Sequence, residues 1–230
     1  MLFRDPGQGA TKSDRILASF LSVFSSALTI KGGLIVVNEI LFKKAQNGDV
    51  EAFETLIRGY EKLIYNAAYR MLGDAGDAED ASQEVILKVY RNLSACKAST
   101  AFKSWLFRII NNTCIDELRK KKGKSTLSLD VRLDDSDSRM EDFVLKDETT
   151  PESEFLRKDL SKNIQKAIDK LPPDYKAIIV MRDINELSYD EITEALGINI
   201  GTVKSRIARG RKRLRDELLE SGISLHQEQT

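Results

Sequence analysis

Two clusters of basic side chains are the residues of this chain whose type and spacing could do chemistry. Residues 202–215 hold seven lysines and arginines and no acid. Residues 102–124 hold seven more against two acids, a net charge of +5. Lysine and arginine neutralise phosphate groups, and arginine also reads guanine edges in the major groove of DNA. The clusters therefore indicate nucleic-acid binding, and the alternative for a charge run alone is a solvated helix face.

The rest of the composition argues against most enzymatic chemistry. The chain of 230 residues carries 36 basic and 36 acidic side chains, so its formal net charge is zero and charge has to be considered by segment. Two cysteines, Cys96 and Cys114, are too few for a disulfide framework. One histidine, His226, leaves the chain without the residues for metal catalysis or a Cys–His nucleophile. We expect no cofactor, no metal and no enzymatic activity, in a cytoplasmic protein with reduced thiols.

The more C-terminal basic cluster belongs to a pattern that is typical of a helix-turn-helix. Ser188 is a good N-cap residue, and Glu191 stands at the third helical position, which is the spacing of a capping box. Gly197 permits the left-handed backbone that ends such a helix, and Thr202 can cap the next one. The apolar positions that would face inward are Ile192, Ala195, Leu196, Ile198, Val203, Ile207 and Leu214. A capped helix, a glycine turn and a basic helix in this order favour a DNA-reading helix over an ordinary solvated one.

The other basic cluster lies on a second strongly predicted helix. Phe102, Leu106 and Ile109 form its apolar face, and it ends in the basic run at residues 119–122. Trp105 lies on the same apolar face. The residues themselves therefore favour a core position for this tryptophan over a platform on which a base could stack.

Helical periodicity also organises the rest of the chain, and no strand is predicted. Residues 73–76 break one helix, and Asp77 can cap the next. Residues 130–154 carry a net charge of −7, and their composition predicts a flexible linker. Helical spacing returns at residues 155–171 and stops at Pro172-Pro173. The predicted fold class is all-α, with two small helical domains joined by a flexible acidic linker.

At these motifs the chain resembles a known family. The segments LSYDEI at residues 187–192 and GTVKSRIARGRKRL at residues 201–214 resemble region four of the extracytoplasmic-function (ECF) sigma factors of bacterial RNA polymerase, in the sigma-70 family. The segments DAEDASQEV at residues 77–85 and FKSWLFRI at residues 102–109 resemble region two. Two motif sets in the right order are more specific than either alone. One departure is Thr193, where such helices usually have alanine.

The resemblance implies an ECF sigma factor, which binds core polymerase and directs promoter recognition and transcription initiation. Its partners would be the beta-prime clamp helices and the beta flap of core polymerase, promoter DNA and an anti-sigma factor. The chain would be divided into region two at residues 38–122, a linker at 123–154, region four at 155–220 and a tail at 221–230.

The resemblance also implies a role for particular residues. Those implied for polymerase binding are Asp77, Asp80, Gln83, Glu84 and Lys88. Those implied at the minus-ten element are Lys103, Trp105, Arg108, Asn111, Asn112, Arg119 and Lys120. Those implied at the minus-thirty-five element are Thr202, Lys204, Ser205, Arg206, Ala208, Arg209 and Arg211, of which Thr202, Arg206 and Arg211 suit phosphate better than bases.

Three other classes of protein compete with this interpretation. A helix-turn-helix regulator that does not bind polymerase would explain residues 188–214 but not the motifs at residues 77–109. An enzyme finds no support in a nucleophile–base pair, a phosphate loop or a metal cluster. A secreted or membrane-anchored protein is suggested only by the apolar run Ile16–Ile30, which is short for a membrane span and is followed by Lys31. We expect no stable membrane insertion.

Residues 1–37 differ from all that follows, and we expect them to be a non-functional or disordered extension. Lys31-Gly32-Gly33 is what a purine-rich ribosome-binding site would give if it were read as codons. Val36 or Val37 could then be a GTG start codon. The sequence therefore favours a mis-assigned start over a signal-like anchor or a disordered tail.

Overall fold

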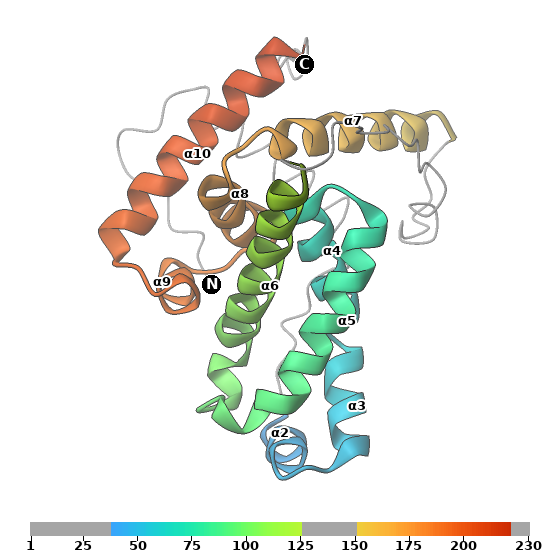
Figure 1. The fold of residues 1–230 in the computed structure, drawn as a ribbon, viewed down its shortest axis with the longest axis vertical. Coiled ribbons are helices and arrows are strands. Elements are labelled where there is room, and N and C mark those ends of the chain that lie inside the picture. Colours follow the sequence, from blue (N-terminus) through green and yellow to red (C-terminus); the bar gives the residue numbers. More distant parts are fainter. Residues whose placement is uncertain (1–37, 126–150, 222–230) are drawn as a thin grey trace.

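The computed structural model describes residues 38–125 and 151–221, with side chains described over residues 38–122 and 160–221. The hypothesis about residues 1–37 and the prediction of a flexible linker lie outside the described residues. Within them the chain forms helices and connecting loops without a strand, and the all-α prediction is confirmed. Figure 1 shows two groups of helices, which we call the N-terminal bundle (α2 to α6) and the C-terminal bundle (α7 to α10).

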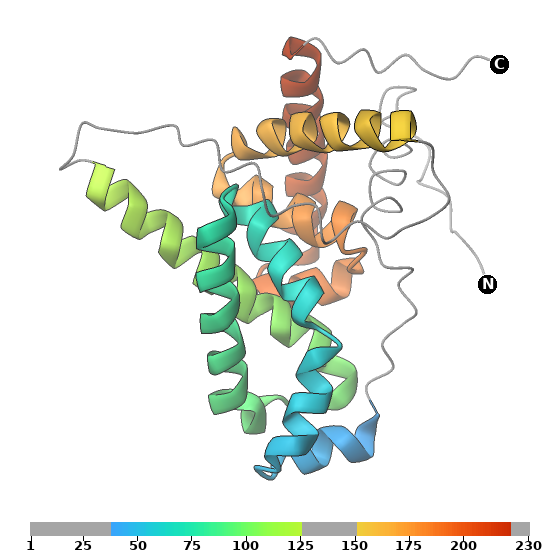
Figure 2. The same cartoon turned by 90° about the vertical axis from the view of Figure 1, so that its right-hand side faces the viewer.

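The N-terminal bundle is built around two long helices. Its elements are α2 (Glu39–Gln46), α3 (Val50–Arg58), α4 (Glu61–Leu72), α5 (Ala75–Asn92) and α6 (Phe102–Ser125), with short 3-10 turns at Leu93–Ala95 and Ser99–Ala101. The two 3-10 turns connect α5 to α6. Figure 2 shows that the C-terminal end of α6 extends beyond the bundle.

The connection between α4 and α5 corrects one prediction. Gly73 ends α4 with a φ of 77°, a left-handed backbone that favours glycine. The carboxylate of Asp74 then accepts a 2.8 Å hydrogen bond from the backbone N–H of Asp77. The N-cap is thus Asp74 and not Asp77, because Asp74 reaches the free N–H groups first. Asp77 lies instead in the first turn, where its charge stabilises the helix dipole.

Aromatic and aliphatic side chains fill the interior of the N-terminal bundle. Phe102 and Leu106 from α6, Ile64 from α4 and Val85 from α5 are fully buried. The ring of Tyr60 meets that of Phe102 edge to face, with 5.0 Å between their centres. Each large apolar side chain buried in this way contributes about 1.5–3 kcal/mol from its removal from water. This interior fixes the faces that α5 and α6 present to the outside.

The C-terminal bundle contains the predicted helix-turn-helix. Its elements are α7 (Pro151–Asp169), α8 (Pro173–Ile179), a π-helical turn at Val180–Ile184, α9 (Tyr189–Leu196) and α10 (Ile200–Glu220). The prediction that Pro172-Pro173 separates two helices is confirmed. A Cβ on Gly210 would lie 3.1 Å from Cγ1 of Ile179, so this glycine allows α10 to approach α8 closely.

The caps of α9 and α10 test the predicted motif directly. The Ser188 hydroxyl accepts a 3.1 Å hydrogen bond from the N–H of Glu191, whose carboxylate accepts a 2.7 Å bond from the N–H of Ser188. The capping box is confirmed, as is Gly197, whose φ is 66°. Thr202 is not the cap of α10. Asn199 caps it and accepts a 2.8 Å bond from the N–H of Thr202, so the helix begins at Ile200.

The two bundles pack against each other along α6 and α4. Helix α9 lies along the N-terminal half of α6, and α4 meets α7, α8 and the π-helical turn at Val180–Ile184. In Figure 1 the C-terminal bundle follows one side and the top of the N-terminal bundle. In Figure 2 α7 crosses α10 above the N-terminal helices. The buried apolar residues of the two bundles belong to one continuous cluster.

Candidate nucleic-acid and polymerase interfaces

The outer face of α10 carries exposed basic and small side chains. Val203, Ile207 and Leu214 are buried against the bundle, which fixes the rotation of the helix. The residues that this rotation leaves exposed include Lys204, Ser205, Ala208, Arg209 and Lys212. A helix that follows a capped turn and presents such side chains can enter a major groove and contact base edges and phosphates.

Two arginines of α10 that were predicted to contact phosphate form ion pairs within the C-terminal bundle. A guanidinium nitrogen of Arg206 lies 3.1 Å from the Asp174 carboxylate, which is exposed. Arg211 binds both carboxylate oxygens of Asp183, with Nε at 3.1 and 3.2 Å. Asp183 is largely buried, so its charge depends on this pair. Arg211 therefore holds α10 against the π-helical turn, a role that the sequence did not predict.

The N-terminal half of α6 is partly covered by α9. The Ser104 hydroxyl lies 2.6 Å from a carboxylate oxygen of Glu194, and it is buried. The guanidinium of Arg108 donates a 2.5 Å hydrogen bond to the backbone oxygen of Glu194, at the C-terminal end of α9. A cation is favoured at that end of a helix, where carbonyl groups are unsatisfied. Arg108 was predicted at the minus-ten element, and here it contacts the helix-turn-helix.

The middle of α6 faces a cleft between the bundles. Asn111, Asn112 and Arg119 line it from α6, and Arg206 lines it from α10. Asn111 is half-buried, and no hydrogen bond is found for its buried side-chain oxygen among the described residues. Residues for which the resemblance implies contacts with two separate promoter elements thus line a single cleft.

The other predicted minus-ten residues lie at the two ends of α6. Trp105 packs against the core, with its ring centre 6.0 Å from that of Phe102, and it remains partly exposed. Lys103 is half-buried and Lys120 is exposed. Lys120 also forms a 2.6 Å ion pair with Glu117, whose hydrogen bond and charge raise the pKa of the lysine.

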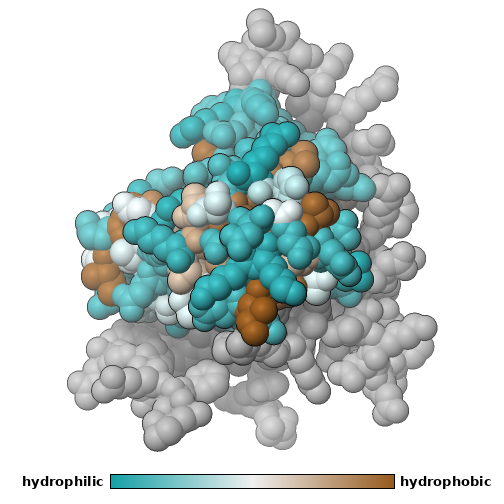
Figure 3. Space-filling view, turned by 90° about the horizontal axis from the view of Figure 1, so that it is seen from below, coloured by the Kyte–Doolittle hydropathy of each residue, from teal (hydrophilic) through white to brown (hydrophobic). Residues whose placement is uncertain are grey.

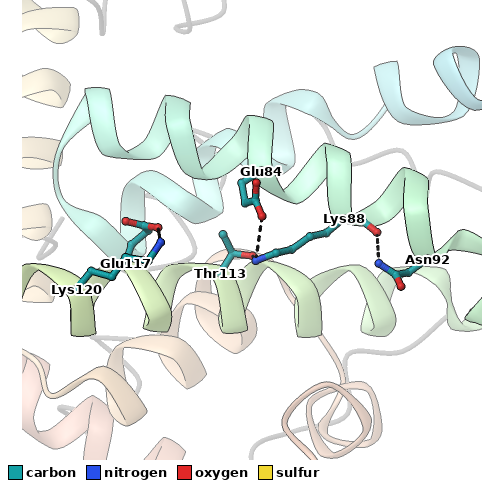
Figure 4. A network of polar contacts seen from close by, with 6 residues as sticks. All are labelled: Glu84, Lys88, Asn92, Thr113, Glu117 and Lys120. Carbon is teal, nitrogen blue, oxygen red and sulfur yellow. Dashed lines mark hydrogen bonds and ion pairs between the residues drawn. The ribbon is translucent and has the colours of Figure 1, made fainter.

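Helix α5 presents a polar face beside α6. Asp80, Gln83 and Glu84 are exposed at helical spacing, while Val85 and Val89 are buried behind them. Figure 4 shows how this face is joined to α6, because Lys88 reaches both Glu84 on its own helix and Thr113 on α6. The distances from its ammonium nitrogen are 3.5 Å to Glu84 and 3.1 Å to Thr113.

The remaining predicted polymerase-binding residue also has a partner on α6. The carboxylate of Asp77 pairs with the ammonium group of Lys121. Exposed apolar residues continue the same face of α5, and sequence reasoning missed them. Leu87 and Tyr90 are nearly half exposed, one and two turns beyond Gln83. Their signal was present in the sequence as apolar residues at the helical spacing of the polar face.

The described residues give no sign of a metal centre or of a reactive thiol. No set of three or more His, Cys, Asp or Glu side chains there could hold a metal ion. Both thiols are buried, and burial raises the pKa of Cys114 to about 12.

Among the described helices, none has the length and apolar character that crossing a membrane requires. The lower face in Figure 3 is mainly hydrophilic, with hydrophobic side chains in separate spots.

The similarity of this chain to known proteins follows the same two regions. Residues 56–124 match the family described as Sigma-70 region 2, and residues 161–214 match Sigma-70, region 4. The ECF RNA polymerase sigma factor SigW of Bacillus subtilis is 40% identical over 176 residues, which are 76% of this chain and 94% of that protein. This chain belongs to the ECF sigma factors. It is thus a transcription-initiation protein of the sigma-70 family.

A second relative agrees with this assignment, and two solved structures share the fold. The ECF RNA polymerase sigma-E factor of Escherichia coli K12 is 32% identical over 177 residues, which are 77% of this chain and 92% of that protein. The structure of CnrH in complex with the cytosolic domain of CnrY has a TM-score of 0.56 and 21% identity, over 80% of this chain and 97% of that one. The sigma factor RpoE of Bartonella quintana, in complex with the anti-sigma factor NepR, has a TM-score of 0.55 and 20% identity, over 74% and 98%. These two structures support the fold alone.

Proposed function

We propose that this ECF sigma factor binds core RNA polymerase mainly through α5 and reads a promoter through α6 and α10. The observation that carries the proposal is the presence of both sigma regions in one chain, in the order of the family. Region two would correspond to residues 38–122 and region four to residues 155–220. The protein would act by positioning the polymerase, without catalysing a reaction, in the cytoplasm.

The exposed polar face of α5 supports its assignment to polymerase. Asp80, Gln83 and Glu84 do not contribute to the apolar interior, so the fold alone does not require them. Carboxylates on an exposed face can pair with basic residues of a protein partner, which mainly gives specificity and a faster association. The clamp helices of the beta-prime subunit would be that partner, and the beta flap would contact the C-terminal bundle.

The chemistry of α6 and α10 supports a division of labour on the promoter. Lys204, Ser205 and Arg209 are exposed on the outer face of a helix-turn-helix, which suits double-stranded DNA. Asparagine and aromatic side chains on α6 suit a strand whose bases are extruded, because amide edges and rings can read unpaired bases. The basic residues at 119–122 would then stabilise the phosphates.

The experiment that tests the proposal is copurification of the full chain with core polymerase on a sizing column. A sigma factor elutes with core at a ratio of one to one. A helix-turn-helix regulator that does not bind polymerase, the competing function, elutes alone and still retards DNA. An anti-sigma factor is a further expected partner, and a pull-down from cells with tagged chain would identify it as a protein displaced by core.

A further inference from the structure

The chain passes from α5 to α6 through a loop of mainly small residues, and α2 lies beside this loop. The loop comprises residues 93–101 and includes the two 3-10 turns. In Figure 1 α2 lies at the lower end of the N-terminal bundle, where this connection is made. Leu93 and Cys96 are buried, whereas Ser94 and Ala98 are exposed. The loop leads directly into the helix that we propose reads the minus-ten element.

One side chain of α2 is hydrogen-bonded to the backbone of this loop. The amide nitrogen of Gln46 donates a 3.1 Å hydrogen bond to the backbone oxygen of Leu93 and a 2.7 Å bond to that of Cys96. The Leu93 oxygen also accepts a 3.0 Å bond from the backbone N–H of Cys96. Gln46 therefore connects α2 to both ends of the first turn of the loop.

Gln46 is itself held in place at the end of α2. Gly48, whose φ is 91°, turns the chain just after it, and Asp49 then caps α3. One turn before Gln46, the ring of Phe42 meets that of Phe102 edge to face, with 5.7 Å between their centres. Since Phe102 is the first residue of α6, helix α2 fixes both the loop and the start of α6.

We propose that Gln46 is a positioning residue for promoter specificity, because its amide holds the loop in the conformation that selects an unpaired base of the minus-ten element. The inference rests on the proposed function, in which α6 and the loop before it meet the opened strand. Gln46 would not contact the DNA. It would act through the backbone of the loop.

The small side chains of the loop explain why its backbone must be held. An extruded base is recognised by hydrogen-bonding groups at fixed positions around its edge. The exposed residues Ser94, Ala95 and Ala98 have short side chains, so backbone groups and a hydroxyl would form much of the surface that a base meets. Two bonds from one helix favour a single conformation of these groups. The exposed Lys97 and the half-buried Lys103 would bind the neighbouring phosphates.

Hydrogen exchange tests whether Gln46 holds the loop in the free chain. Gln46→Glu keeps the shape of the side chain, but a carboxylate cannot donate to the two backbone oxygens. The amides of Cys96 and Ala101 are bonded within the loop, and we expect them to exchange roughly tenfold faster in this variant. Equal exchange in the variant and the parent chain would overturn the inference.

The base preference of the holoenzyme tests whether the held loop gives specificity. Each chain is combined with core polymerase and titrated against single-base variants of the minus-ten element, and promoter opening is followed with a fluorescent base analogue. At one position of the element, Gln46→Glu should reduce the preference for one base over the others by about tenfold, with unchanged affinity for core. Gln46→Lys, which keeps a donor, should retain more of this preference. An equal loss of opening on every promoter variant, or an equal loss of preference in both Gln46 variants, would overturn the inference.

The matched control removes a similar hydrogen bond from the C-terminal bundle. The amide of Asn185 donates a 2.9 Å bond to the backbone oxygen of Val180, so Asn185→Asp is the same change of group far from the loop in sequence. It should leave the minus-ten preference unchanged. A shift equal to that of Gln46→Glu would contradict a role of the loop.

The outcomes separate the inference from the proposed function. If the parent chain opens its promoter with a clear minus-ten preference and Gln46→Glu keeps that preference, the inference alone fails. If the parent chain opens no promoter with core, the proposed function fails, and the inference falls with it.

Discussion

The N-terminal and C-terminal bundles each place basic residues on a long helix, but the two helices differ in how closely the other bundle approaches them. Helix α6 is hydrogen-bonded by α9, whereas Ser205 and Arg209 of α10 face α6 across a cleft. On α10 the predicted base readers Lys204 and Arg209 are exposed, and no hydrogen bond or ion pair of theirs is found among the described residues. On α6 the corresponding face is covered by α9 and lines a cleft. The basic residues of the two helices thus differ in their contacts, because α9 of the C-terminal bundle packs directly on α6.

The difference concerns which of the proposed binding residues are exposed on each bundle. Lys204, Ala208 and Lys212 of α10 are exposed, whereas Ser104 and Arg108 of α6 are hydrogen-bonded to α9. The polar face of α5 is exposed in this structure, so the proposed polymerase contact requires no rearrangement of the bundles.

Loss of the α5 face should have the largest effect. Asp80→Lys together with Glu84→Lys reverses two exposed charges, and we expect core affinity to fall roughly 100-fold, as for the loss of close charge pairs at an interface. The fold should persist because neither side chain is buried. Titration of labelled chain with core polymerase measures the affinity.

The matched control places the same reversals elsewhere on the N-terminal bundle. Glu51→Lys with Glu54→Lys changes two exposed residues of α3 and should leave core affinity nearly unchanged. Equal losses in both double variants would indicate a general charge effect and remove α5 from the interface.

Arg211→Ala should destabilise the C-terminal bundle. It leaves the largely buried Asp183 carboxylate without its bidentate partner, at a cost of roughly 2–4 kcal/mol. Thermal unfolding followed by circular dichroism measures the loss, and Asp183→Asn/Arg211→Met should recover part of it. If Arg211→Ala unfolds like the parent chain but binds all DNA more weakly, its main role is phosphate contact.

Arg209→Ala should affect DNA and leave stability unchanged. Its side chain is exposed, so its removal should not alter the melting temperature. If it contacts a base edge, we expect a loss of about 1–3 kcal/mol in holoenzyme affinity for the promoter and a relaxed preference at one base pair. Binding to a set of single-base variants at one salt concentration tests this, and a uniform loss on every sequence would reassign Arg209 to phosphate.

Cys114 should give the smallest effect, through the pH dependence of stability. Burial raises its pKa to about 12 in the folded chain, well above its ordinary value of 9.0. The unfolded chain therefore loses the thiol proton first, and the contribution of this group to stability declines as pH rises from about 9 towards 12. Denaturant titrations at pH 8 and pH 10 should show a smaller decline for Cys114→Ala than for the parent chain. An equal decline would count against a strongly buried thiol.

Local signals in the sequence predicted much of the fold. The capping box of Ser188 and Glu191, the Gly197 turn and the proline break before α8 each depend on residues close in sequence. The errors at Asp77 and Thr202 are also local. In each case another capping residue, Asp74 or Asn199, stands three positions earlier, and capping preference alone does not choose between two good candidates.

Contacts between distant residues could not be predicted in this way. The partners Arg70 and Gln165 are 95 residues apart, and Ser104 and Glu194 are 90 apart. Nothing in the residues around Arg108 indicates that a helix of the other bundle will cover it. The sequence therefore predicted which helices carry the candidate sites, but not which of those sites is accessible.

Run-off transcription combined with footprinting tests the central claim most directly. With purified core polymerase, the full chain should produce transcripts from one defined start site on its own promoter. Protection of that promoter should extend over two patches centred roughly 25 base pairs apart, about 85 Å of DNA. A chain that protects a single patch without core, and adds no transcript when core is present, would contradict the claim that it is the promoter-selecting subunit of the polymerase.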